Sequence, residues 1–171
     1  FKINPMITLL QTNQPVDTAE FATLVVGALD AIEQCYKEEV AAGIPEKFQK
    51  DNTTTYYSMK NKLHALSCRQ YLAFCGQMFF SNHQYDKAKD AFDKYMHFSE
   101  TYTIVAEETK MDPEDANTAK MAYFTCLASY FAKDYKTLAA YLPMAKKYTQ
   151  EINQVNQLEM TSYIEQGDTK L

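Results

Sequence analysis

The chain has 171 residues, of which 46% are hydrophobic and 13% aromatic, as expected for a folded globular protein of about one domain. Its 4 glycines and 5 prolines are too few for the many turns of a β-rich fold, so an all-α fold is expected. A formal net charge of −5 and a single arginine, Arg69, argue against nucleic acid as a partner and against a nucleotide or phosphopeptide site. No apolar run approaches the roughly 20 residues that span a bilayer, so no integral membrane segment is expected.

The first long helix is predicted over about residues 18–42, after a short helix from Asn4 to Leu10. Asp17 and Glu20 form a capping-box pattern at its start. Gly43 suits a left-handed C-cap, and Ile44-Pro45 is predicted to stop the helix. Its apolar residues follow the 3.6-residue period: Phe21, Leu24, Val25, Ala28, Ile32, Cys35, Tyr36 and Val40.

The middle of the chain is predicted to form a loop and two further helices. Residues 48–52 have the composition of a loop, and a long helix is expected over about 54–81. A third helix is expected over about 85–102, with an extension to Glu108 left open.

Two more helices are predicted in the last third of the chain. Asp112 can cap the fourth helix, with Pro113 at its first position. Tyr135 opens the fifth, and Pro143 is predicted to kink or restart it. The helical pattern then continues to about Gln166.

The stretch from Leu72 to Phe98 has the pattern of a helical hairpin built for close packing. Gly76 and Phe79 precede a polar turn, and Tyr85, Ala88 and Phe92 follow it. In this order the residues resemble the tetratricopeptide repeat, which places a small residue, a large residue, an aromatic, an alanine and a second aromatic at these places. Such hairpins cannot bury their own apolar face and must stack on neighbours.

A second, weaker copy lies 50 residues later. The turn before Tyr135 matches the turn before Tyr85, but Cys126, Ser129 and Leu138 replace the first copy's Gly76, Phe79 and Ala88. Two features depart from the family. In the first copy, Tyr95 stands where the family usually has a small residue, and the spacing of 50 residues between the copies exceeds the family's repeat length of about 34.

The resemblance implies one domain over residues 1–171, with hairpin-like units at about 54–102 and 113–150. Five to seven antiparallel helices are expected in all, stacked as a right-handed α-α superhelix. More loosely, the chain looks like the N-terminal part of secreted bacterial repeat proteins of unknown role. That likeness implies a periplasmic or secreted location, with a cytoplasmic one as the alternative.

The sequence offers no recognisable reaction chemistry. His64, His83 and His97 have no partner at metal-ligand spacing, and the four cysteines match no zinc pattern and fit a buried core. No phosphate-binding loop or nucleophile motif occurs. We therefore expect no catalytic, metal or cofactor site, and no enzyme activity.

The expected function is a protein–protein or peptide interaction module, in which an exposed end of the stack is also able to drive homodimerisation. In the resembled family, the first helix of each hairpin lines the concave face, so exposed residues of those helices are candidates for binding. The alternative is that the candidate residues only contact the next helix of the stack. The other function considered is glycan binding at the cell envelope, with aromatic rings as stacking platforms. The residues that the resemblance places on the concave face are Gln70, Ala73, Gln77, Phe80, Lys120, Tyr123, Leu127 and Tyr130.

Overall fold

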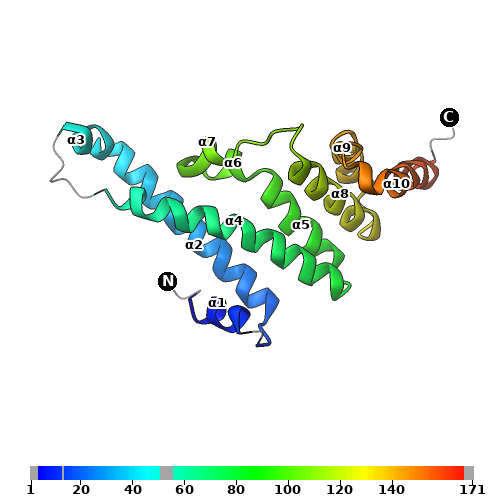
Figure 1. The fold of residues 1–171 in the computed structure, drawn as a ribbon, viewed down its shortest axis with the longest axis horizontal. Coiled ribbons are helices and arrows are strands. Elements are labelled where there is room, and N and C mark those ends of the chain that lie inside the picture. The colour runs from blue at the N-terminus through cyan, green and yellow to red at the C-terminus, as the bar shows by residue number, and fades with distance from the viewer. Residues whose placement is uncertain (1–3, 13, 51–55, 168–171) are drawn as a thin grey trace. The chain divides into compact units, whose positions relative to one another are not determined.

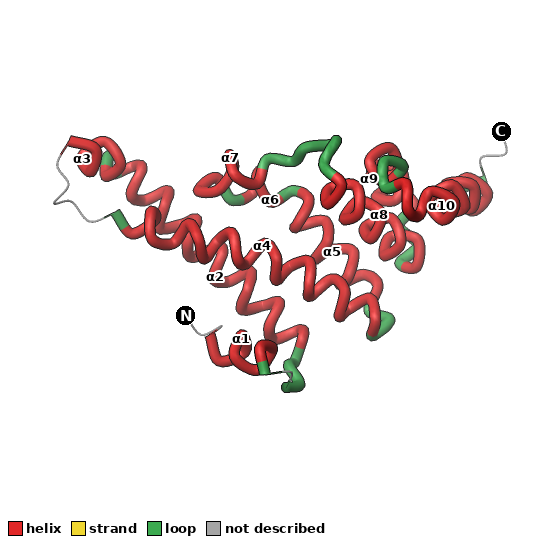
Figure 2. The backbone as a smooth tube through the Cα atoms, viewed as in Figure 1, coloured by secondary structure: helices red, strands yellow, loops and turns green. Residues whose placement is uncertain are grey.

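In the computed structural model, the chain is described over residues 4–12, 14–50 and 56–167, which fold into helices joined by short turns (Figures 1 and 2). Within those ranges there are ten α-helices, two 3₁₀ turns and no strand. The predicted all-α class is confirmed, but the expected number of five to seven helices is too low. The residues group into two compact units, one of 1–72 and 98–110 and the other of 73–97 and 111–171. A single domain and a superhelical stack stay predictions.

The first unit is built on α2 and the start of α4. Asp17 caps α2 as predicted, because its Oδ1 accepts hydrogen bonds from the N–H groups of Ala19 and Glu20 at 2.9 and 3.0 Å. Gly43 follows the helix at φ +66°, so the predicted left-handed C-cap is confirmed. The helices of this unit are α1 (Asn4–Gln11), α2 (Thr18–Ala41), α3 (Ile44–Lys50), α4 (Tyr57–Ser81) as far as Leu72, α6 (Phe98–Thr101), η1 (Thr103–Val105) and α7 (Ala106–Thr109).

Two predictions for the first unit are wrong. Residues 48–50 are not a loop, because Ile44-Pro45 begins α3 instead of only ending α2. Pro is tolerated in the first turn of a helix, where its missing N–H leaves no intrahelical bond unmade. The predicted loop residues 51 and 52, and the predicted start of the long helix at 54, lie outside the described residues. The helix expected over 85–102 also breaks, since α5 ends at Met96 and α6 begins at Phe98.

Carboxylates from α2 hold the neighbouring segments of this unit. Glu39 accepts hydrogen bonds from the N–H groups of Tyr57 and Ser58 at 2.8 and 2.9 Å, and so caps α4 from a different helix. Glu33, only 4% exposed, accepts from the Thr103 hydroxyl at 2.5 Å and from the Ile104 N–H at 3.2 Å. These bonds tie both the start of α4 and the turn η1 to α2.

The second unit is made of stacked helices that pack pairwise. α8 packs against α5 and α9, and α10 packs against α8 and α9. Its helices are α4 from Ala73 onward, α5 (Tyr85–Met96), α8 (Ala116–Phe131), α9 (Tyr135–Ala145), η2 (Thr149–Glu151) and α10 (Ile152–Glu165).

The two turns that the sequence comparison matched have the same backbone geometry. His83 and Lys133 both adopt φ +59°. The N–H of Gln84 bonds to the carbonyl of Phe79 at 2.9 Å, and 50 residues later Asp134 bonds to the carbonyl of Ser129 at 2.8 Å. Both are Schellman turns, and both place a residue other than glycine in the left-handed position.

The ring of Phe92 on α5 packs against α4 at Gly76. A Cβ placed on Gly76 would lie within 3.0 Å of carbons of the Phe92 ring, and both residues are buried. The close contact that the sequence predicted is therefore present. In the second copy, Cys126 stands at the matching place, and its thiol donates to the carbonyl of Leu138 at 3.6 Å.

The start of α8 lies three residues later than predicted. Asp115 is the N-cap, and its Oδ2 accepts from the Thr118 N–H at 2.7 Å. Asp112 instead closes a tight turn by accepting from the Glu114 N–H at 2.9 Å, which leaves Pro113 outside the helix. Further on, α9 runs through Pro143 and ends at Ala145, so the helix does not restart at Pro143 as predicted. The helical pattern resumes at η2 and α10, after a turn over residues 146–148.

Candidate binding site

The eight residues predicted for a concave face fall into both units. Gln70 lies on the part of α4 that belongs to the first unit, and the other seven lie in the second. Gln77 is exposed on α4, with Ala73 and Phe80 half-buried on the same helix. On α8 the exposures differ: Lys120 is exposed, Tyr123 is buried, and Leu127 and Tyr130 are half-buried.

A groove of about 360 Å³ lies between α8 and α10 and includes two of those residues. We call it the α8–α10 groove. Its size falls in the range of ordinary ligand pockets. α10 was expected only as a continuation of the fifth helix, so its wall of the groove was not predicted. The lining residues are Leu127, Tyr130 and Phe131 from α8, and Gln154, Gln157, Leu158 and Thr161 from α10.

Tyr123 is buried on α8 and orients Gln154, which lines this groove. It is 5% exposed, and its hydroxyl donates to Gln154 Oε1 at 2.6 Å. Burial, with the nearby Glu151 and Tyr148, raises the pKa of Tyr123, so the hydroxyl keeps its proton and remains a donor. Because the amide oxygen of Gln154 faces Tyr123, its NH₂ group is left as the end that can donate to a ligand.

Thr161 and Gln157 complete the polar rim of the groove. The Thr161 hydroxyl donates to the backbone carbonyl of Gln157 at 2.8 Å, so its oxygen keeps acceptor capacity. The Gln157 side chain is exposed and offers both a donor and an acceptor. The rim can therefore form hydrogen bonds with neutral donors and with neutral acceptors of a ligand.

Phe131, the last residue of α8, is the exposed aromatic that the sequence analysis did not single out. Its side chain is 47% exposed although its ring stacks on Tyr85, with centroids 4.8 Å apart and planes at 21°. Edge contacts with Phe80 at 5.8 Å and Tyr130 at 5.3 Å hold it from two other sides. The one signal in the sequence was the position of Phe131 directly before the polar turn that precedes Tyr135. An aromatic side chain at the end of a helix is less completely covered by neighbouring helices than one in the middle.

A second groove of about 330 Å³ is also lined by Phe131, together with residues of the two Schellman turns. We call it the turn groove. Unlike the α8–α10 groove, it carries charged side chains: Lys87 and Asp86 from the start of α5 and Lys133 from the turn after α8. The His83 ring, whose Nδ1 lies 2.8 Å from the Tyr85 hydroxyl, also lines it.

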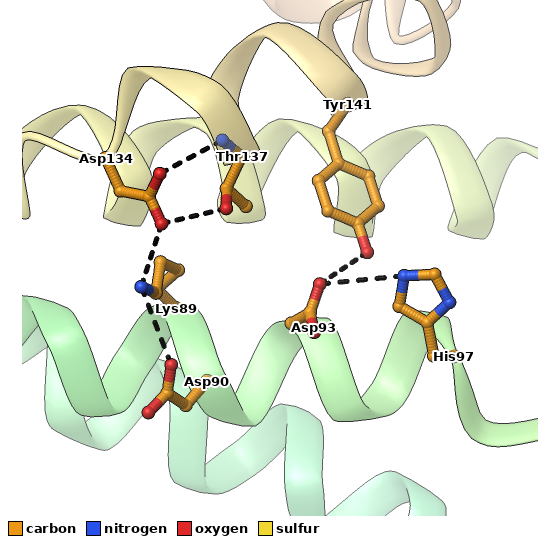
Figure 3. A network of polar contacts seen from close by, with 7 residues as sticks. All are labelled: Lys89, Asp90, Asp93, His97, Asp134, Thr137 and Tyr141. Carbon is orange, nitrogen blue, oxygen red and sulfur yellow. Dashed lines mark hydrogen bonds and ion pairs between the residues drawn. The ribbon is translucent and has the colours of Figure 1, made fainter. Parts of the chain in front are cut away.

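A network of polar contacts fixes α9 against α5 (Figure 3). Asp134 accepts hydrogen bonds from the Thr137 N–H and hydroxyl at 3.1 and 2.8 Å, and Lys89 lies 2.9 Å from it. Farther along, the Tyr141 hydroxyl donates to Asp93 at 2.7 Å. These contacts hold the turn that follows Phe131 in place.

The ionisation of the pair Lys89–Asp134 follows from these contacts. The hydrogen bond from the Thr137 backbone, with further bonds from Lys89 and the Thr137 hydroxyl, lowers the pKa of Asp134 to about 2. The same pairing raises the pKa of Lys89. Both groups are charged at neutral pH, so the pair persists over the physiological range.

Within residues 4–12, 14–50 and 56–167, no group of three or more His, Cys, Asp and Glu side chains is placed to hold a metal ion. Of the histidines considered above, His83 lines the turn groove, and His97 lies 3.7 Å from Asp93 on the same helix (Figure 3). His64 is exposed on α4. The described surface around Phe131 therefore offers aromatic faces, amides and a few charges, which are the groups of a binding site.

Among the described helices, none combines the length and the apolar character that a transmembrane segment requires. No protein-family model, no curated protein and no solved structure matches this chain.

Proposed function

We propose that this protein is a helical interaction module that binds an extended peptide segment of a partner protein in the α8–α10 groove. The observation that carries the proposal is the chemistry of the groove. Leu127 and Leu158 give it an apolar floor, and Gln154, Gln157 and Thr161 give it a neutral hydrogen-bonding rim. An extended peptide presents alternating N–H and C=O groups, which side-chain amides and hydroxyls match one for one.

The electrostatics of the groove favour an uncharged segment. None of the described residues that line it carries a charge at neutral pH. A charged ligand group would lose its hydration there without gaining a counter-charge, which is unfavourable. The likeness to tetratricopeptide repeats supports the same proposal, because the family's concave face corresponds to positions that include Leu127 and Tyr130, and both line the groove.

The proposal is tested with displayed libraries of uncharged ten-residue peptides. We expect selection of peptides with an apolar residue, whose affinity falls about five-fold in Gln157→Ala, the loss of roughly one hydrogen bond. Tyr130→Ala removes ring contact and is expected to weaken binding at least as much, with folding nearly intact. Asn156→Ala and Tyr163→Ala are the matched controls, because both residues are exposed on α10 and outside the groove lining. Equal losses in variants and controls would contradict the proposal.

Gln77→Ala distinguishes a wider concave face from the groove alone. Gln77 is exposed on α4 and does not line the α8–α10 groove. If the binding surface extends over α4 as the resemblance implies, this variant weakens peptide binding too. Unchanged affinity would limit the site to α8 and α10.

Glycan binding is the second candidate, and it is favoured by the two rings of Tyr130 and Phe131 beside amide side chains. Aromatic faces stack on sugar rings, and amides bond to hydroxyl groups. The same variants are therefore tested against a panel of soluble oligosaccharides. Saturable binding to a sugar that Phe131→Ala abolishes, with no peptide selected, would replace the first proposal by this one. A periplasmic or secreted location fits both candidates and is part of the proposal.

A further inference from the structure

We infer that the bound segment continues past Phe131 and places an acidic residue in the turn groove. This inference rests on the proposed function, and it adds the charge pattern of the partner. The two grooves share Phe131 as a lining residue, and this residue is 47% exposed. A peptide that leaves the α8–α10 groove over Phe131 therefore reaches a residue that also lines the turn groove.

The walls of the turn groove differ in charge from those of its neighbour. One wall, from the start of α5, carries Lys87 and Asp86, and the other, from the turn after α8, carries Lys133. Among the lysines and carboxylates that line the groove, the two lysines exceed the single carboxylate by one positive charge. The nearby Asp134 does not line the groove and is already bonded to Lys89 and Thr137.

Backbone geometry fixes the main chain from which one of these lysines projects. Lys133 adopts φ +59° in a Schellman turn, where its N–H bonds to the Tyr130 carbonyl at 3.0 Å. Lys87 is positioned by its own contact, with its ammonium 5.6 Å from the centre of the Phe79 ring. A carboxylate between the two walls is attracted by both lysines, whereas a lysine of the ligand is repelled. The partner is thus a protein segment with an uncharged, apolar stretch followed or preceded by Asp or Glu.

The test uses three libraries of uncharged ten-residue peptides extended by Glu-Glu, Gln-Gln or Lys-Lys at either end. We expect the Glu-extended peptides to bind about ten-fold more tightly than the Gln-extended ones, and the difference to shrink at high salt. In the double variant Lys87→Gln with Lys133→Gln this difference is lost, because the affinity for the Glu-extended peptides falls to that for the Gln-extended ones. Lys133→Arg keeps the charge and is expected to keep the difference.

The control double variant is Lys94→Gln with Lys136→Gln, which removes the same charge from exposed positions of α5 and α9 outside the groove lining. A loss of discrimination in this control as large as in the groove variant would assign the effect to net charge and overturn the inference. Equal affinity for Glu- and Gln-extended peptides would also overturn it, while leaving the α8–α10 groove as a peptide site. Failure of all three libraries would overturn both proposals.

Discussion

The contact between Gly76 and Phe92 depends on a single missing methyl group. Because a Cβ at Gly76 would lie within 3.0 Å of the ring, Gly76→Ala forces α4 and α5 apart or turns the ring out of its rotamer. We expect the free energy of unfolding to fall by about 1–3 kcal/mol. Gly76→Leu is expected to cost about 2 kcal/mol or more for the same reason. Chemical denaturation followed by circular dichroism measures both.

Gly27 provides the matched control on a helix of the same kind. It is exposed in the middle of α2, and no atom lies within 4 Å of the place where its Cβ would be. Gly27→Ala is therefore expected to raise stability, by about 0.5–1 kcal/mol, since alanine restricts the unfolded chain. If both alanine variants shifted the midpoint in the same direction, the close approach at Gly76 would be disproved.

Ser129 is a buried polar side chain on α8, and its Oγ has no hydrogen-bond partner among the described residues. Leaving a buried hydroxyl unpaired costs about 1–3 kcal/mol relative to a paired one. Ser129→Ala removes that group without changing the shape of the core much, so stability is expected to stay equal or to increase. A clear decrease in the midpoint would show that the hydroxyl has a partner in solution.

At the scale of the elements, the position of α9 depends on the charge of Asp134. Its pKa is lowered to about 2 in the folded protein, against an ordinary value near 3.9. The stabilisation is therefore complete above about pH 4 and is lost as the pH falls through about 2. Asp134→Asn retains a good N-cap but loses the ion pair with Lys89, so its stability is expected to vary less with pH in this window.

The comparison variant for this prediction is Asp90→Asn. Asp90 lies 3.7 Å from Lys89, and its side chain is 63% exposed, so solvent weakens this pair. Thermal midpoints measured from pH 2 to pH 7 give, for each protein, the slope of stability against pH. Identical slopes for wild type and Asp134→Asn would refute the assigned role of the pair.

The turn η1 is held to α2 by Glu33. Burial opposes ionisation of this carboxyl, but hydrogen bonds from Thr103 and Ile104 outweigh it, so the pKa of Glu33 is lowered overall. Glu33→Gln keeps the size but exchanges one acceptor oxygen for a donor that faces these partners. We expect a loss of about 1–3 kcal/mol and faster amide exchange in residues 98–110. Glu38→Gln, at an exposed position of the same helix, is expected to change neither the stability nor the amide exchange of residues 98–110.

At the scale of the whole molecule, the burial of the cysteines reports on both units at once. Cys68, Cys75 and Cys126 are buried, and Cys35 is half-buried. Burial raises the pKa of Cys68 to about 11 and that of Cys75 and Cys126 to about 12, so few reactive thiolates form at neutral pH. We expect one thiol to react quickly with a disulfide reagent in the native protein, and all four after denaturation. Rapid reaction of more than one thiol would show that a core is open.

The sequence determined much of the local structure of this protein. Caps and breakers act within a few residues, so Asp17 and Gly43 marked the ends of α2, and the spacing around Gly76 indicated a close hairpin. Local signals failed where two of them competed. Asp112 and Asp115 are both good caps, and only the bond to Thr118 selected the second. The break at His97 was also missed, since the apolar pattern continues through it.

The candidate site was decided mainly by tertiary structure. The resemblance pointed to Leu127 and Tyr130, but Phe131 and the α10 wall of the groove depend on which faces of helices meet. The same is true of Glu33, Glu39 and Asp134, whose partners lie far away in the sequence or on another helix. A sequence indicates the period of its helices, and those ends that a single cap or breaker marks, because these depend on neighbouring residues. Which surfaces become buried or form a groove depends on contacts between distant segments, and only the folded chain brings these together.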